Sequence, residues 1–154
     1  MTKEIIMMMG IPGSGKSTYI QNHLMSETTI VLSSDEIREE LYGDVSNQNH
    51  NDEVFKLLYS RINMYLNNEN VERIVFDATN INKKRRINFI KYIKSIATVP
   101  LDINCIYMAV PFATCVERNS KRDRVVPIEV LERMHLQLSI PTLDENFDTI
   151  TFVR

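Results

Sequence analysis

The stretch "GIPGSGKST" at residues 10–18 constrains the fold more than any other part of the sequence. It satisfies the pattern G-x-x-x-x-G-K-[ST], whose chemistry requires a turn between a buried strand and the start of a helix. The apolar run before it, "EIIMMM", predicts that strand, and "KSTYIQNHL" predicts that helix. The pattern therefore has the flanking structure that it needs, and its alternative, an ordinary strand-to-helix turn, is disfavoured.

The loop itself predicts an anion site. Gly10, Gly13 and Gly15 let the backbone curl until successive N–H groups point at phosphate oxygens, and the helix dipole adds positive potential. Lys16 would reach the β- and γ-phosphates of a nucleotide, and the hydroxyl of Ser17 would face Mg²⁺. We expect ATP and Mg²⁺ at this loop, with contacts from Gly10, Pro12, Gly13, Ser14, Gly15, Lys16, Ser17 and Thr18.

The rest of the chain alternates between short apolar runs and helical patterns. A length of 154 residues fits one domain, 1–154, around a single core. Strands separated by helices predict right-handed βαβ units, hence an α/β fold with a five-stranded parallel sheet and helices on both faces. Ser34 or Asp35 can cap a helix that Gly43 ends, and a polar, turn-rich connection follows at 44–51. The later strands are "TIVLS", "VERIVF", "LDINCIYMAV" and "DTITFV".

Composition narrows the class of protein. Hydrophobic residues make up 44% of the chain and charged residues 25%, as in soluble globular proteins, and no apolar run approaches the roughly 20 residues of a membrane span. The N-terminus lacks a signal-peptide pattern, so we expect no membrane partner and a cytoplasmic location. Cys105 and Cys115 form neither a CxxC pair nor a disulfide framework, which predicts reduced thiols.

Charge is unevenly distributed. The net charge of −2 argues against a protein that coats nucleic acid by bulk electrostatics. Two segments are nevertheless basic: "KKRRINFIKYIK" at 83–94 and "ERNSKRDR" at 117–124. Each could face a local anionic ligand or could be a solvated surface.

Polar side chains follow the second and third predicted strands, at the edge where parallel sheets bind ligands. Asp35 could take a proton from an attacking hydroxyl, and Arg38 could hold an anionic acceptor or orient that carboxylate. Their alternatives are a helix cap and a surface ion pair. Asp77 could bind Mg²⁺ through water or steer an arginine, while Thr79 and Asn80 could contact the acceptor or form the turn and cap the next helix.

The loop "RNSKRDR" lies between two predicted helices and is too positive to be buried. We expect a short lid at about residues 118–127 that lays Arg118, Arg122 or Arg124 over the phosphates, neutralising charge and excluding water. A solvated loop is the alternative.

The motifs "GIPGSGKST", "SSDEIR", "DATN" and "RNSKRDRVVPIEVLERM" occur in this order along the chain. In this combination the chain resembles the kinase domain of polynucleotide 5′-hydroxyl kinases, within the P-loop kinase superfamily that includes adenylate-kinase-like enzymes. The resemblance implies a sheet order 2-3-1-4-5, ATP and Mg²⁺. It also implies that Asp35 is the general base, that Arg38 binds the phosphate of the acceptor, and that Arg122 reaches the donor phosphates.

The leading hypothesis is transfer of the γ-phosphoryl of ATP to the 5′-hydroxyl of a DNA or RNA end. A kinase of a small metabolite such as a nucleoside or sugar would use the same donor machinery. A nucleotide-dependent binding module is the third hypothesis. A GTPase is disfavoured because the sequence has no N-K-x-D motif and "DATN" does not match D-x-x-G.

Overall fold

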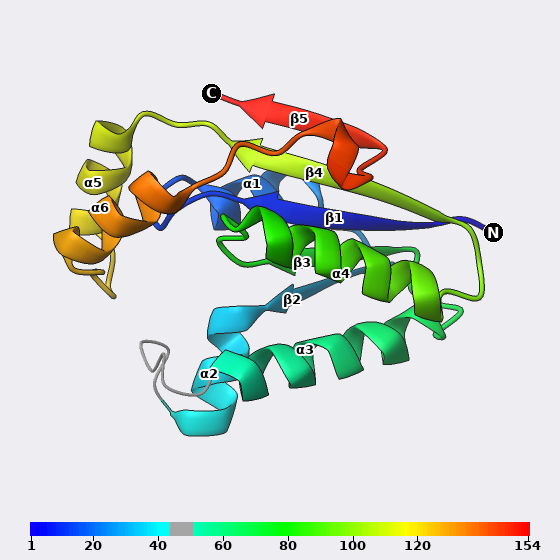
Figure 1. Ribbon diagram of the computed structural model, residues 1–154. Helices are drawn as coiled ribbons and strands as arrows, with labels where there is room; N and C mark the ends of the chain where they lie inside the picture. Colours follow the sequence, from blue (N-terminus) through cyan, green and yellow to red (C-terminus); the bar gives the residue numbers. More distant parts are fainter. Residues whose placement is uncertain (44–50) are drawn as a thin grey trace.

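The computed structural model describes residues 1–43 and 51–154 and contains one parallel sheet (Figure 1). Its strand order, β2-β3-β1-β4-β5, is the predicted one, and all four pairings are parallel. The turn-rich connection expected at 44–51 lies outside the described residues, apart from Asn51. The strands are β1 (Lys3–Met9), β2 (Thr29–Ser33), β3 (Arg73–Asp77), β4 (Leu101–Met108) and β5 (Thr149–Val153).

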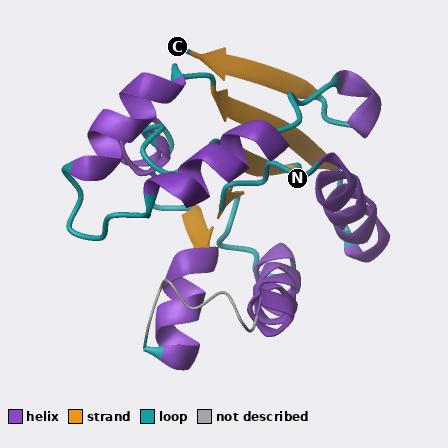
Figure 2. Ribbon diagram, turned by 60° about the vertical axis from the view of Figure 1, so that its left-hand side comes forward, coloured by secondary structure: helices purple, strands orange, loops and turns teal. Residues whose placement is uncertain are grey.

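Helices connect the strands and cover both faces of the sheet, as predicted. Figure 1 shows α4 in front of the sheet and α1 behind it, and Figure 2 shows the same layers from the side. The helices are α1 (Lys16–His23), α2 (Ser34–Tyr42), α3 (Asn51–Leu66), α4 (Lys83–Ile96), α5 (Phe112–Ser120), α6 (Ile128–Gln137) and a 3-10 turn, η1 (Leu143–Glu145).

The central strand β1 divides the core into two layers. Its alternate side chains point to opposite faces, so Met7 and Met9 pack with residues of α3 and α4, whereas Met8 packs with Ile20 of α1. All three methionines are fully buried. The methionine run is therefore core, and β1 carries the glycine loop at its carboxyl end in a fixed position.

The start of α2 differs from the expectation by one residue. Ser33, rather than Ser34 or Asp35, is the N-cap, and its side chain accepts a hydrogen bond from the backbone N–H of Glu36. Gly43 ends the helix in the left-handed conformation, as expected. Because Ser33 takes the capping role, the carboxylate of Asp35 is left for other contacts.

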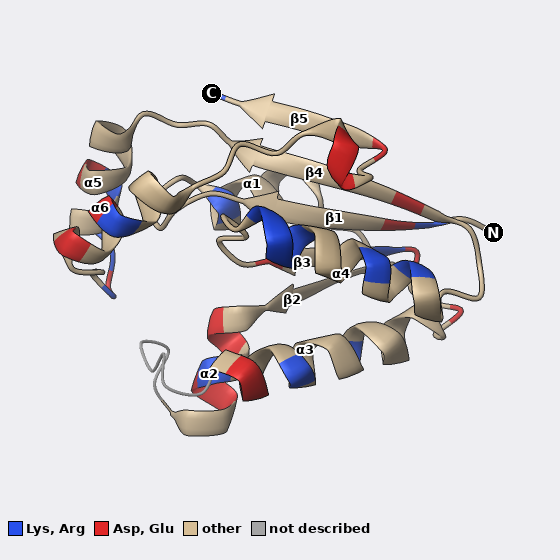
Figure 3. Ribbon diagram, in the orientation of Figure 1, with Lys and Arg blue, Asp and Glu red and all other residues tan. Residues whose placement is uncertain are grey.

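The basic helix α4 combines a buried and an exposed set of cations. Arg86 is buried and pairs with Glu145, so it does not belong to a solvated face. Lys84 and Arg85 in the first turn are exposed, and Figure 3 places this basic turn at the carboxyl edge of the sheet. Asn82 caps the helix by accepting from the N–H of Arg85.

Two further expectations concern the whole chain. Cys105 and Cys115 are free and buried, in agreement with the expected reduced thiols. Within the described ranges, none of the helices has the length and apolar character needed to cross a membrane.

Candidate active site

The glycine loop is held in a shape that favours glycine at three positions. Gly10, Gly13 and Gly15 have positive φ angles of +155°, +85° and +95°. A Cβ at Gly13 would lie 2.4 Å from the carbonyl oxygen of Cys115 in α5. The loop is therefore packed directly against the helix that leads into the lid segment.

Lys16 begins α1 and turns back over the loop. Its Nζ donates to the carbonyl oxygens of Gly10 at 2.7 Å and Ile11 at 3.2 Å. Burial lowers the pKa of Lys16 to about 8, an effect that Asp77 and Asp35 oppose. Among the described residues no carboxylate forms an ion pair with Lys16. A desolvated ammonium without a carboxylate partner fits a phosphate, which would supply the missing negative charge.

Asp77 ends β3 on the same edge. Burial raises the pKa of Asp77, the positive charge of Lys16 lowers it, and the carboxylates of Asp35 and Glu36 raise it. These mutual effects show that Lys16, Asp35 and Asp77 share one electrostatic environment, as their positions after three strands predicted.

The side chains near the glycine loop can be compared with the needs of the expected Mg²⁺ ion. Ser17 is exposed in the first turn of α1, where its hydroxyl is open to a ligand. No group of three or more acidic, histidine or cysteine side chains suitable for a metal occurs in the described ranges. These residues are compatible with Mg²⁺ if the protein supplies only one or two of its oxygen ligands. Phosphate and water would supply the others.

Asp35 and Arg38 form a close pair at the start of α2. Nη1 of Arg38 donates to Oδ1 of Asp35 at 2.7 Å, while its Nε and Nη2 donate to Oδ1 of Asn51 at 3.2 Å and 2.9 Å. Only 7% of the Arg38 side chain is exposed, against 45% of the Asp35 side chain, so the guanidinium is buried while the carboxylate is partly open to solvent. A guanidinium held by two neighbours keeps the Asp35 carboxylate in one orientation.

The segment predicted as a lid, residues 118–127, contacts the same carboxylate. Nη2 of Arg124 donates to Oδ2 of Asp35 at 2.9 Å. Nη1 of Arg118 lies 3.4 Å from the carbonyl oxygen of Ser14 in the glycine loop. Arg122 is close enough to lower the pKa of Lys16. The lid arginines thus face both the loop and Asp35.

The base of the lid is fixed by Asn119, which is 3% exposed. Its Nδ2 donates to the carbonyl oxygen of Val126 at 2.8 Å, and its Oδ1 accepts from the N–H of Val126 at 3.1 Å. One side chain therefore ties the two ends of the loop 120–125 together.

The "DATN" turn is hydrogen-bonded to the end of β1 and the start of the glycine loop. The N–H of Gly10 donates to the carbonyl of Thr79 at 3.0 Å, and Nδ2 of Asn80 donates to the carbonyl of Met8 at 2.7 Å. Asn80 has a φ of +51°, and its carbonyl accepts from Nη1 of Arg86 at 2.9 Å. The turn role expected for Asn80 is thus observed, although Asn82 caps the helix; contact of Thr79 and Asn80 with an acceptor stays a prediction.

The structure brings Lys16, Asp35 and Asp77 together with arginines of α2 and the predicted lid. It also adds partners that the sequence did not reveal: Asn51 for Arg38, Val126 for Asn119, and Glu145 for Arg86, which is 59 residues away. Arg124 lay within the predicted lid, and its basic context was the one available signal.

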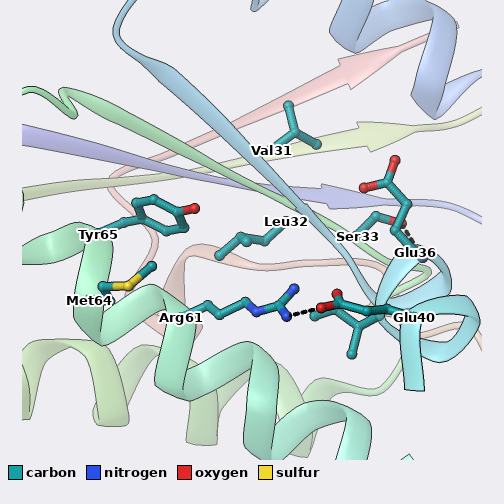
Figure 4. Close-up of a pocket in the computed structure, with 9 residues that line it drawn as sticks. Val31, Leu32, Ser33, Glu36, Glu40, Arg61, Met64 and Tyr65 are labelled. Atoms are coloured by element: carbon teal, nitrogen blue, oxygen red, sulfur yellow. Dashed lines mark hydrogen bonds and ion pairs between the residues drawn. The ribbon is translucent and has the colours of Figure 1, made fainter.

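A cavity of about 210 Å³ lies outside this cluster, beside the edge strand β2. Figure 4 shows that β2, α2 and α3 line it and that Arg61 pairs with Glu40 across it. Neither Lys16 nor Asp35 belongs to its lining. The candidate active site is therefore the open edge above the glycine loop rather than this cavity.

A parallel sheet of order 2-3-1-4-5 whose central strand leads into G-x-x-x-x-G-K-S is the adenylate-kinase-like fold of P-loop kinases. Residues 5–141 match the family described as an AAA domain, and the chain belongs to this family.

Solved structures with the same fold include kinases of different kinds. A putative kinase from Chloroflexus aurantiacus has a TM-score of 0.76 at 19% identity, over 99% of this chain and 88% of that chain. A fungal RNA kinase has a TM-score of 0.75 at 16% identity, over 100% of this chain and 38% of that chain. A Pnkp1/Rnl/Hen1 RNA repair complex contains a chain with a TM-score of 0.73 at 22% identity, over 88% of this chain and 44% of that chain.

A gluconokinase from Sinorhizobium meliloti also shares the fold, with a TM-score of 0.59 at 18% identity, over 97% of this chain and 81% of that chain. This chain spans less than half the length of the two RNA-related chains. No curated protein matches the sequence.

Proposed function

We propose that the protein is a kinase that transfers the γ-phosphoryl of ATP to a hydroxyl, with the 5′-hydroxyl of a polynucleotide as acceptor. The observation that carries the proposal is the convergence of Lys16, Asp35 and Asp77 above the glycine loop. A phosphate-binding lysine beside an oriented carboxylate is the arrangement that phosphoryl transfer to a hydroxyl requires.

Each residue has a distinct part in this reaction. Backbone N–H groups of the glycine loop and the Lys16 ammonium hold the donor phosphates, with Arg118 and Arg122 above them. Asp35, oriented by Arg38, accepts the proton of the attacking hydroxyl. Ser17 and Asp77 would hold Mg²⁺, which would supply positive charge to offset the charge that develops on the leaving group. ATP supply and two free thiols suit the cytoplasm.

A polynucleotide acceptor is supported by cations near the proposed base. Arg38 presents a buried guanidinium beside Asp35, which suits the phosphate on the 3′-oxygen of the nucleotide whose 5′-hydroxyl reacts. The basic first turn of α4, which contains the exposed Lys84 and Arg85, lies at the same edge of the sheet (Figure 3). The fold shared with an RNA kinase is consistent with this acceptor.

A small hydroxyl compound is the second candidate acceptor. The fold shared with a gluconokinase favours it, because the donor machinery would be the same in both cases. A binding module without catalysis would need the loop but not the oriented carboxylate of Asp35.

The test is incubation of the protein with γ-labelled ATP, Mg²⁺ and either a 5′-hydroxyl oligonucleotide or a panel of nucleosides and sugars. We expect label on the oligonucleotide end, and none on an otherwise identical oligonucleotide that already carries a 5′-phosphate. Label on a small compound but not on the oligonucleotide would replace the proposed acceptor. ATP binding without transfer to any hydroxyl would favour the binding module.

A further inference from the structure

Both carboxylate oxygens of Asp35 accept hydrogen bonds from arginines. Oδ1 accepts from Arg38 at 2.7 Å and Oδ2 accepts from Arg124 at 2.9 Å. The proposed base has to accept a hydrogen bond from the attacking hydroxyl before it can take its proton. Each carboxylate oxygen can accept two hydrogen bonds, but a guanidinium on the oxygen that receives the proton competes with the hydroxyl for it. Displacement of one of the two guanidinium groups would leave that oxygen open to the hydroxyl.

The two arginines differ in burial and in their other hydrogen bonds, which indicates which of them can be displaced from Asp35. Arg38 is 7% exposed and donates to Asn51 through two further nitrogens, so its guanidinium is fixed on both sides. The Arg124 side chain is 32% exposed, and Asp35 is its one hydrogen-bonding partner among the residues that the structure describes. An ion pair of this exposure is weak and readily exchanged. Arg124 is the displaceable partner.

The lid geometry allows this exchange without unfolding of the lid. Asn119 ties the ends of the loop through its two bonds to Val126, which keeps the loop base in place. Arg124 lies in the loop between these two residues. Its guanidinium can leave Oδ2 by rotation of its long side chain while the base of the loop stays closed.

We infer that Arg124 is a latch that occupies Oδ2 of Asp35 until the hydroxyl of the acceptor displaces it. The inference rests on the proposed function. After displacement, the acceptor O–H proton passes to Oδ2, the acceptor oxygen bonds to the γ-phosphorus, and the bond from that phosphorus to the β–γ bridging oxygen breaks, leaving ADP with the electron pair.

The latch would favour transfer to the acceptor over hydrolysis of ATP. A water molecule is small and gains few contacts in the site, so it has little binding energy with which to displace a guanidinium. An acceptor also binds through groups remote from its hydroxyl, and that binding energy can offset the loss of the Arg124 pair. Arg124 would thus act as a specificity-determining residue against water.

The decisive measurement is the ratio of ATP hydrolysis without acceptor to phosphorylation of a 5′-hydroxyl oligonucleotide. We expect Arg124→Gln to raise this ratio by about two- to fivefold, the population change that an ion pair of this exposure corresponds to. Lys121→Gln is the matched control, because Lys121 is a lid cation that pairs with Glu117 instead, and its ratio should equal that of the wild type. Arg124→Lys keeps the charge and should restore most of the wild-type ratio.

Contrary results are distinguishable. A ratio in Arg124→Gln equal to the wild type, with normal transfer, would overturn the latch and leave the proposed function intact. A ratio equally raised in Arg124→Lys would also overturn it, since lost packing and not lost charge would then be the cause. Hydrolysis without any transfer by the wild type would contradict the polynucleotide acceptor instead.

A measurement independent of activity tests the pair itself. In urea unfolding, Arg124→Gln should lower the midpoint in the wild-type background and leave it unchanged in the Asp35→Asn background. Equal shifts in both backgrounds would show that the two side chains do not interact in solution and would overturn the latch.

Discussion

Arg86 and Glu145 form an ion pair whose two side chains are both 0% exposed, at 2.7 Å between Nε and Oε1. The same arginine donates to the carbonyl of Asn80, and Glu145 also accepts from the N–H of Thr142. The pair thus joins the segment before β5 to the turn that supports the glycine loop. Removing either partner would leave an uncompensated buried charge next to the active site.

Loss of this pair should therefore destabilise the fold strongly. We expect Arg86→Met to lower the free energy of unfolding by about 3–5 kcal/mol, the range for breaking a buried ion pair. The double variant Arg86→Met/Glu145→Leu should recover much of the loss, because no charge stays buried. Arg61→Met, at the partly exposed pair with Glu40, is the control and should cost less than about 1 kcal/mol in urea unfolding. Equal losses at the two sites would contradict the structure.

Replacing glycine at Gly13 and at Gly43 allows the cost of a steric clash to be measured separately from the conformational cost of a positive φ angle. Both have positive φ, but an added Cβ at Gly13 would meet the Cys115 carbonyl at 2.4 Å, whereas nothing lies within 4 Å at Gly43. Gly43→Ala should cost about 1 kcal/mol, the conformational penalty alone. We expect Gly13→Ala to cost clearly more and to abolish ATP binding, measured by urea unfolding and calorimetric titration. Normal ATP binding by Gly13→Ala would show that the loop does not need the contact with α5.

Lys16 should make stability depend on pH in the alkaline range. Its folded pKa of about 8 lies below the ordinary value of 10.5, so the unfolded chain binds more protons between these values and stability rises with pH. Below pH 8 both states are protonated and the buried charge exerts its full cost. Relative to Lys16→Met, the wild type should therefore gain stability from pH 8 to 10.5, in urea unfolding without ligand. A constant difference between the two proteins over this range would contradict the burial of the charge.

ATP should reverse this effect, since phosphate oxygens favour the charged ammonium. Binding at pH 9 should then take up a large fraction of one proton, measured as the dependence of binding enthalpy on the ionisation enthalpy of the buffer. Lys16→Met provides the control and should bind ATP more weakly without this uptake.

Asp35→Asn should reduce the rate of transfer by roughly 10² or more while ATP binding is preserved, the scale of general-base removal. Glu36→Gln removes the adjacent, exposed carboxylate and should leave the rate close to that of the wild type. The comparison uses single-turnover rates with saturating ATP. Comparable losses in the two variants would argue for a general electrostatic effect and against a base at Asp35.

Much of this fold could be predicted because local patterns determine it. The buried strand, the glycine loop and the alternation of strands and helices specify a parallel sheet, and the sheet places Lys16, Asp35 and Asp77 at one edge. The cap of α2 was wrong by one residue because "SSD" offers three residues with capping side chains in a row. Local propensity cannot choose among them without the position of the preceding strand.

Side-chain partners could not be predicted in the same way. Asn119 and Val126 lie only seven residues apart, but no motif indicates their bonds, and Glu145 pairs with Arg86 across 59 residues of chain. Such contacts depend on how segments pack after the sheet has formed, so a single sequence contains no local signal for them.

The two hydrogen bonds between Asn119 and Val126 also indicate which part of the predicted lid can change without affecting the fold. The turn between these residues starts and ends at one anchored point, so we expect residues 121–125 to tolerate changes in length without a change in the helices on either side. Substitution within this turn would then alter the arginines that face Asp35 and Lys16 and leave the fold intact.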